Sequence, residues 1–275
     1  MSCMISVGVI AAAVITGLCV GVVAGMLGVG GGIVMLPVFR LGFGLGALQT
    51  TATSLFTIIP TSVSGVVTHI RGKTCIPKLG IALGIGGAVA SPLGVWLAQH
   101  SPSWAVMVAA AVAICYSAST MLRKALALPK SGAVKGGGAS EPLPDPSEAF
   151  VPSVRNYAFA VGIGVIAGAA SGYIGLGGGF LMIPFMVSLM HLPMKLASGT
   201  SLVAVMILAT PATIMQCLLG NVDIVMGIAV ACGSIPGATI GARLAKRAPE
   251  RRLRFLFAGL LVVAAILLVV KEFTM

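Results

Sequence analysis

The sequence predicts an all-α integral membrane protein made of two inverted-topology repeats, and three observations support this prediction. First, 58% of the 275 residues are hydrophobic and only 8% are charged, which leaves too little polar surface for a water-soluble protein. Second, apolar runs of about 18 or more residues, long enough to span a bilayer as helices, recur along the chain. Third, a glycine-rich motif occurs twice, and the loops of the two halves have opposite charge preferences.

The repeated motif is GMLGVGGGIVMLP at residues 25–37, which returns as GYIGLGGGFLMIP at residues 172–184. The two copies are offset by 147 residues, the difference between positions 175 and 28. The same offset places Thr53-Ser54-Leu55 on Thr200-Ser201-Leu202 without a gap. A repeat of this length indicates two domain-sized halves and not a solenoid.

The apolar blocks follow the same order in each half. The first half, residues 1–122, contains Ile5–Leu41, Ala47–Ile70, Leu79–Ala98 and Trp104–Leu122. Residues 123–155 are hydrophilic and rich in Gly, Pro and Ser, which is typical of a flexible linker. The second half, residues 156–275, contains Asn156–Met190, Leu196–Leu219, Ile224–Ala245 and Phe255–Val270.

The loop charges predict how the halves are oriented. Arg71–Lys78 is basic, whereas its counterpart Gly220–Asp223 carries only an acid; Gln99–Ser103 has no Lys or Arg, whereas its counterpart region, residues 246–254, has five. Opposite charges on equivalent loops indicate opposite sides of the membrane. Under the positive-inside rule, residues 71–78, the linker and residues 246–254 are cytoplasmic, and both termini lie outside.

This orientation requires a hairpin in each half. If the linker is inside and Gly220–Asp223 is outside, Asn156–Met190 must cross an even number of times, because Leu196–Leu219 crosses once. We therefore expect 8–10 transmembrane or re-entrant helices, with each glycine motif at the tip or break of a hairpin. Parity leaves both possibilities open, although Ile33 to about Leu41 is short for a full crossing.

The glycine motifs are the first candidate site. Discontinuous membrane helices present unpaired N–H groups and positive dipole ends to anionic substrates, and glycine permits the necessary backbone conformation. The alternative is that the glycines only permit close helix packing. The candidate substrate-binding residues are Gly28, Gly30, Gly31, Gly32, Gly175, Gly177, Gly178 and Gly179.

The second candidate is the pair of hydroxyl motifs that begin one membrane helix in each half. Thr53 and Ser54 in the first half correspond to Thr200 and Ser201 in the second. Hydroxyls in membrane helices often bond their own backbone or a neighbouring helix. The functional interpretation is that these four side chains add neutral donors for the same anion.

Other chemistry finds little support in the sequence. All six acids lie in loops or at segment ends, so no carboxylate is expected at membrane depth to relay protons or hold sodium. The six cysteines show no CxxC spacing and are interpreted as apolar fillers, so no metal or cofactor is expected. The basic residues flank apolar runs without an aromatic platform, which argues against a nucleic-acid partner. His69, His100 and His191 lie near segment ends and are first interpreted as structural.

The chain resembles the sulfite exporter TauE/SafE family, also called the TSUP permeases. The resemblance rests on AGMLGVGGGIVMLP and SGYIGLGGGFLMIP, each followed by a hydroxyl motif, TTATSL or ASGTSL. It covers nearly the whole chain except the linker. It implies a permease of the bacterial inner membrane for small sulfur oxyanions or organosulfonates, without a cofactor.

The expected function is therefore transport of a small anion by alternating access around a midplane site at the repeat interface. The alternatives are an anion channel or uniporter, a non-transporting membrane scaffold, and a membrane enzyme. The enzyme is disfavoured because no cluster of His, Cys, Asp or Glu lies at membrane depth. The sequence leaves open the substrate, the direction of transport, its energy source and the oligomeric state.

Overall fold

The computed structural model describes residues 7–127 and 154–274, and every element in these ranges is helical. Seven of the helices, α1, α3, α4, α5, α6, α8 and α9, are long and apolar enough to cross a membrane. The prediction of an all-α integral membrane protein is confirmed. The elements are α1 (Val7–Leu27), α2 (Gly32–Pro37), the π-helix η1 (Val38–Gly42), α3 (Ala47–Arg71), α4 (Pro77–Gln99), α5 (Ser103–Ala127), α6 (Val154–Ile174), α7 (Gly179–Leu189), α8 (Met194–Leu218), α9 (Ile224–Arg247) and α10 (Glu250–Thr274).

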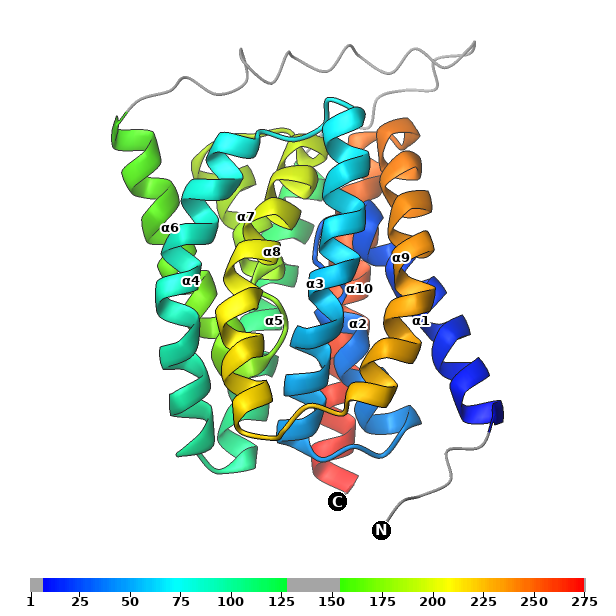
Figure 1. Ribbon diagram of the computed structural model, residues 1–275. Helices are drawn as coiled ribbons and strands as arrows, with labels where there is room; N and C mark the ends of the chain where they lie inside the picture. The colour runs from blue at the N-terminus through cyan, green and yellow to red at the C-terminus, as the bar shows by residue number, and fades with distance from the viewer. Residues whose placement is uncertain (1–6, 128–153, 275) are drawn as a thin grey trace.

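The internal duplication reappears in the helix boundaries. The start of α1 at residue 7 and the start of α6 at residue 154 differ by 147, and α2 and α7, α3 and α8, α4 and α9, and α5 and α10 begin at the same offset. Paired helices run in opposite directions: in Figure 1, α3 rises through the bundle whereas α8 descends. This opposite course supports the inverted-repeat interpretation, which remains a prediction with respect to a membrane.

Each glycine motif breaks a helical hairpin. The motif separates α1 from α2 in the first half and α6 from α7 in the second. The return arms are short, because α2 and η1 comprise 6 and 5 residues and α7 comprises 11. Eleven helical residues extend about 16 Å, roughly half of the ~30 Å hydrocarbon core. The return arms are therefore too short to cross the bilayer as single helices, which favours the broken or re-entrant alternative.

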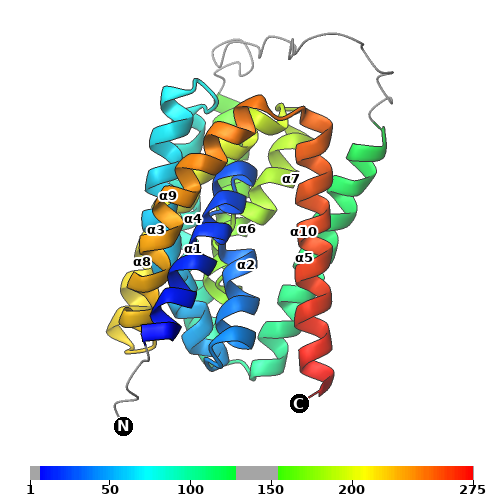
Figure 2. The same ribbon diagram turned by 90° about the vertical axis from the view of Figure 1, so that its right-hand side faces the viewer.

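The two halves exchange their first helices. Helix α1 packs mainly against α9 of the second half, and α6 packs mainly against α4 of the first half; Figures 1 and 2 show both pairs side by side. Glycines make this packing possible. A Cβ atom on Gly21 would lie 2.3 Å from the carbonyl oxygen of Ser234, and one on Gly168 would lie 2.3 Å from that of Gly87. The backbones of the two halves therefore touch directly.

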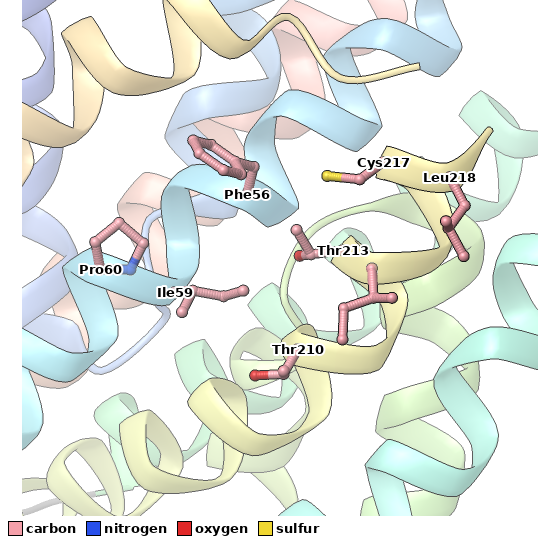
Figure 3. A pocket seen from close by; sticks show the side chains of 8 residues that line it. Phe56, Ile59, Pro60, Thr210, Thr213, Cys217 and Leu218 are labelled. Atoms are coloured by element: carbon pink, nitrogen blue, oxygen red, sulfur yellow. The ribbon is translucent and has the colours of Figure 1, made fainter. Parts of the chain in front are cut away.

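Helices α3 and α8 also face each other across the two halves. A cavity of about 410 Å³ lies between them (Figure 3). Figure 3 shows Thr213 and Cys217 on α8 pointing toward α3, which contributes Phe56, Ile59 and Pro60 to the lining. The full lining is Phe56, Ile59, Pro60, Thr210, Thr213, Ile214, Cys217 and Leu218.

Most basic residues gather at one end of the bundle, the upper end in Figure 1, where α3, α5 and α9 end and α4, α6, α8 and α10 begin. We call this the basic end; its residues are Arg71, Lys73, Lys78, Arg123, Lys124, Arg155, Lys195, Arg243, Lys246, Arg247, Arg251, Arg252 and Arg254. The gathering agrees with the loop charges on which the predicted orientation rests. The cytoplasmic position of this end remains a prediction. The position of both termini on the outer side also remains a prediction.

Some helix boundaries differ from those expected. Helix α5 continues to Ala127 although the linker was expected from residue 123, and α10 begins at Glu250, so that Arg251, Arg252 and Arg254 lie in its first turns. The segment between Ala127 and Val154, which contains most of the predicted linker, lies outside the described residues. The three-part domain division remains a prediction.

Two glycines of α6 provide a test of the helix packing. Gly168→Ala should lower the stability of the protein by about 1–3 kcal/mol, the range for overpacked cores, because the new methyl group would overlap the backbone of Gly87. Gly162→Ala is the matched control, since no atom lies within 4 Å of its Cβ position. Thermal unfolding in detergent measures both. Equal effects of the two substitutions would contradict the packing.

Candidate functional site

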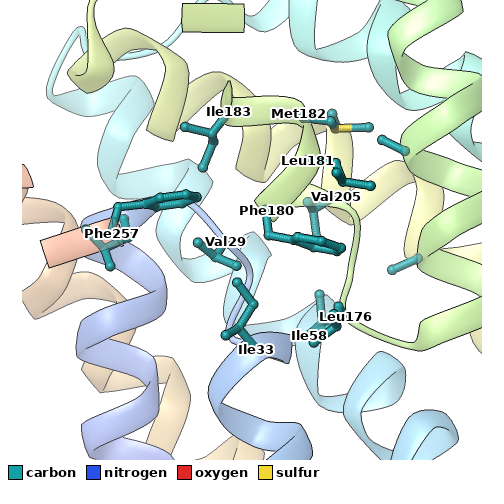
Figure 4. Packing of buried hydrophobic residues seen from close by; sticks show 14 of the residues in the cluster. Val29, Ile33, Ile58, Leu176, Phe180, Leu181, Met182, Ile183, Val205 and Phe257 are labelled. Carbon is teal, nitrogen blue, oxygen red and sulfur yellow. The ribbon is translucent and has the colours of Figure 1, made fainter. Parts of the chain in front are cut away.

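The two glycine loops, residues 28–31 and 175–178, meet at the interface between the halves. A Cβ on Gly32 would lie 2.4 Å from the carbonyl oxygen of Leu176, and one on Gly179 would lie 2.9 Å from that of Gly28. Figure 4 shows Val29 and Ile33 of the first motif in one buried cluster with Leu176 and Phe180 of the second. The structure therefore brings the two predicted motifs together.

The loops take a backbone conformation that requires glycine. Gly31 precedes α2 with φ of 90°, and Gly178 precedes α7 with φ of 67°. Both values lie in the left-handed region, where a side chain is strained. The conformation turns the chain sharply into each return helix. No side chain caps the N-terminus of α2 or α7.

Several backbone amides in these loops have no acceptor. Among the described residues, the amides of Val34 and Met35 bond the carbonyl of Gly31, but those of Gly30, Gly31 and Ile33 make no hydrogen bond. In the second loop the same is true of the amides of Gly177, Gly178 and Phe180. All six residues are buried. Buried donors at two helix N-termini create a positive potential that suits an anion.

The predicted serines bridge the two halves. The hydroxyl of Ser54 donates to the carbonyl of Gly175 at 2.6 Å, and that of Ser201 donates to the carbonyl of Gly28 at 2.6 Å. Each hydroxyl also lies 2.8 Å from a carbonyl of its own helix. The serines thus hold the first glycine of the opposite loop. Their role as direct anion ligands remains a prediction, and each would have to release such a bond to act as a donor.

The predicted threonines also connect the halves, but as acceptors. Thr53 Oγ1 accepts a hydrogen bond from the amide of Asp223 at 3.0 Å, and Thr200 Oγ1 accepts one from the amide of Ile76 at 2.9 Å. The hydrogen bonds of the described residues give neither hydroxyl an acceptor for its own proton. Both threonines therefore keep a donor, as an anion ligand must. Asp223 caps α9, because its carboxylate accepts a hydrogen bond from the amide of Met226.

Two serines that the sequence analysis missed lie beside the loops. Ser62 Oγ lies 3.3 Å from the Cβ position of Gly30, and Ser171 Cβ lies 3.3 Å from that of Gly178. Both serines are fully buried, and neither hydroxyl has a hydrogen-bond partner. Their counterparts at the 147-residue offset are Ala209 and Ala24. A search for polar residues shared by the two halves could not have found them.

The site offers neutral donors and no charged side chain. Among the described residues, His69 and Lys195 are the buried residues of the types His, Lys, Arg, Asp and Glu, and Lys195 Nζ donates to the carbonyl of Lys246. No three His, Cys, Asp or Glu side chains of the described ranges gather as metal ligands would. The groups that these residues offer at the loops are therefore neutral hydrogen-bond donors and acceptors.

Comparison with known proteins identifies a matching family but no similar solved structure. The profile of the family described as "Sulfite exporter TauE/SafE" matches residues 13–268. "Probable membrane transporter protein YunE" of Bacillus subtilis is 29% identical over 84% of this chain and 85% of its own length. YjnA of the same species is 26% identical over 93% and 98%, and MJ0441 of Methanocaldococcus jannaschii is 23% identical over 90% and 91%; both carry the same description. No solved structure matches.

The serine bridges make a direct prediction. Ser54→Ala and Ser201→Ala should each destabilise the protein by about 1–3 kcal/mol, the cost of leaving a buried polar group unpaired, because a glycine-loop carbonyl loses its donor. Ser119→Ala is the control, since its hydroxyl is exposed and bonds only Tyr116 one turn earlier. Thermal unfolding in detergent is the measurement. Unchanged unfolding temperatures for both bridge variants would show that the bridges do not hold the loops.

Proposed function

The chain belongs to the sulfite exporter TauE/SafE family, and from this premise we propose that it carries small sulfur-containing anions, such as sulfite or organosulfonates, across the membrane. The relatives named above are described as membrane transporters, so the chain is a multi-pass protein of a transporter family and not an enzyme. The substrate class and the mechanism are our inference.

The observation that supports an anionic substrate most strongly is the set of unpaired amides in the glycine loops. Amides of residues 30, 31 and 33 and of residues 177, 178 and 180 are buried and have no acceptor among the described residues. An unpaired buried amide costs roughly 1–3 kcal/mol. An oxyanion between the loops would recover this cost, since its oxygens accept several hydrogen bonds at once.

The same surroundings favour a small anion of low charge. The donors are neutral amides and hydroxyls, and Ile58 and Val205 lie next to the loops as apolar walls. Stripping water from an anion becomes costlier as its charge rises. Among the described residues, none of the atoms nearest to the loop glycines belongs to an arginine or lysine that would offset a second charge. Bisulfite and organosulfonates carry one negative charge and an oxygen-rich end that fits such donors.

The mechanism that we propose is alternating access. The loops belong to two halves that pack through interdigitated helices, so a rocking motion of one half against the other would expose the loops to each side in turn. The location consistent with the family is a bacterial inner membrane, with the basic end in the cytoplasm. The lipid bilayer and the small anion are the partners that this function requires.

The two unpaired serines give the sharpest test of the site. Ser62→Ala and Ser171→Ala should leave the fold intact, because neither hydroxyl makes a bond in the protein. Each should weaken anion affinity by about 10-fold or more, the value of a hydrogen bond to a charged ligand. Uptake of radiolabelled sulfite and of an organosulfonate into proteoliposomes, with sulfate as a comparison, measures the effect.

Ser117→Ala is the matched control for this experiment. Ser117 is also fully buried with an unpaired hydroxyl, but it lies on α5, and none of the atoms nearest to the Cβ positions of the loop glycines belongs to it. Normal flux in the Ser62 and Ser171 variants would contradict the site. Absence of flux for every sulfur anion in the unmodified protein would contradict the substrate class, and unitary currents would indicate a channel.

A further inference from the structure

The 147-residue offset allows the two ends of the bundle to be compared residue by residue. His69 near the end of α3 corresponds to Gln216 near the end of α8, since both positions differ by 147. In the same way Thr74 corresponds to Asn221, and Gly25 to Gly172. Any difference between equivalent contacts therefore reports a difference in conformation or packing between the basic end and the opposite end.

At the basic end, His69 joins three segments. Its Nε2 donates to the carbonyl of Gly25 at 3.0 Å, and its Nδ1 accepts from the hydroxyl of Thr74 at 2.7 Å. Gly25 lies in the last turn of α1, where carbonyls lack helical partners. The bonds tie the end of α1, immediately before the first glycine loop, to α3 and to the loop before α4.

At the opposite end, only half of this arrangement is present. Asn221 Nδ2 donates to Gln216 Oε1 at 2.9 Å, which reproduces the pairing of His69 with Thr74. Gln216 Nε2, however, has no hydrogen-bond partner although the side chain is fully buried. Its equivalent at the basic end, His69 Nε2, bonds the last turn of α1. The missing contact is a bond from Gln216 to the carbonyl of Gly172 in the last turn of α6.

The packing of α3 against α8 differs between the ends in the same sense. At the basic end, Val66 packs against Leu202, Val203 and Ile207 in a closed apolar cluster. Their equivalents at the opposite end include Thr213, Phe56 and Pro60, and these line the cavity of about 410 Å³ (Figure 3). Apolar side chains therefore pack between the two helices at the basic end, whereas a cavity lies between them at the opposite end.

Two substitutions between the halves accompany this difference. Gly199 at the basic end has Ala52 as its equivalent, and Gly65 has Ala212. A Cβ on Gly199 would lie 2.2 Å from the carbonyl oxygen of Thr74, and one on Gly65 would lie 2.8 Å from Leu202 Cδ1. Glycine thus permits close contact at the basic end, where the opposite end has a methyl group.

From these contacts we propose that His69 and Gln216 are paired gating residues, and that the structure is the state closed at the basic end and open at the opposite end. This inference rests on the proposed alternating access. In the other state, Gln216 Nε2 donates to the carbonyl of Gly172 while His69 releases Gly25. Each residue thereby couples the helix that precedes a glycine loop to the opening of one end.

Native cysteines report on both ends. Cys75 is buried in the loop before α4 and would contact a side chain at Gly199, whereas Cys217 is exposed and lines the cavity. Burial raises the pKa of the Cys75 thiol to about 11. The reactive thiolate is therefore scarcer than in an exposed cysteine, and both this and the burial make Cys75 react slowly while the basic end is closed. Its rate of alkylation therefore measures how often that end opens.

The experiment uses the full-length protein with only Cys75 or only Cys217 retained, and N-ethylmaleimide as the probe. His69→Leu should raise the labelling rate of Cys75 about tenfold, the effect of losing hydrogen bonds of this kind, and lower that of Cys217. Gln216→Met should lower the labelling rate of Cys75, because it removes the bond to Gly172 that is proposed only for the state open at the basic end. His69→Gln keeps a side-chain amide and should restore much of the slow labelling of Cys75.

A merely structural role predicts a different result. If both substitutions simply loosen the fold, both accelerate Cys75, and if the asymmetry is permanent, Gln216→Met leaves Cys75 unchanged; either result overturns the proposal. Thermal unfolding shows whether His69→Leu folds. If it does not fold, the labelling rates of His69→Gln and Gln216→Met test the proposal. Labelling requires no substrate, so the gating proposal and the substrate proposal can fail separately. Opposite changes in Cys75 labelling without flux of sulfite or a sulfonate would refute only the substrate class. Normal flux without such opposite changes would refute only the gating role of His69 and Gln216.

Discussion

Backbone hydrogen bonding at the glycine loops is the constraint on which the rest of the structure depends. A peptide group at membrane depth has no water to bond, so every irregular segment there needs partners from the protein or from a ligand. The carbonyls of Gly28 and Gly175 receive hydroxyls from Ser201 and Ser54. The amides of Gly31 and of other loop residues have no hydrogen-bond acceptor among the described residues. The loops are thus left with surplus donors, which is the polarity that an anion site requires.

Each half supplies what the other half lacks. Ser54 of the first half holds the second glycine loop, and α6 of the second half packs into α4 of the first through backbone contacts at Gly168. Because every such contact has an equivalent at the 147-residue offset, the centre is built from both halves at once. A movement of one half against the other must therefore move both loops. This coupling is what alternating access around a shared site needs.

The sequence predicts the parts of this design that are written twice. Hydropathy, the duplicated glycines and the loop charges suffice for the helical fold, the hairpins and the approach of the loops. They do not reveal that Ser54 and Ser201 donate to carbonyls, because a hydroxyl motif reads the same whether its proton bonds a substrate or a neighbouring helix. Ser62 and Ser171 are missed for another reason, since alanines stand at the equivalent positions. The extension of α5 to Ala127 is likewise invisible where polar residues continue a helix.

In the proposed mechanism, the differences between the halves determine which end of the bundle is closed. Two identical inverted halves would make the state open to one side and the state open to the other equal in energy. At the basic end, His69 makes a hydrogen bond that its equivalent Gln216 lacks. Gly65 and Gly199 also permit close contacts there, whereas their equivalents at the opposite end are alanines. Such contacts bias the equilibrium toward closure of that end by as much as their free energy differs between the two states. In the proposed mechanism, a bound anion that pairs the loop amides equally in both states leaves this bias unchanged, and the divergent residues determine the resting state.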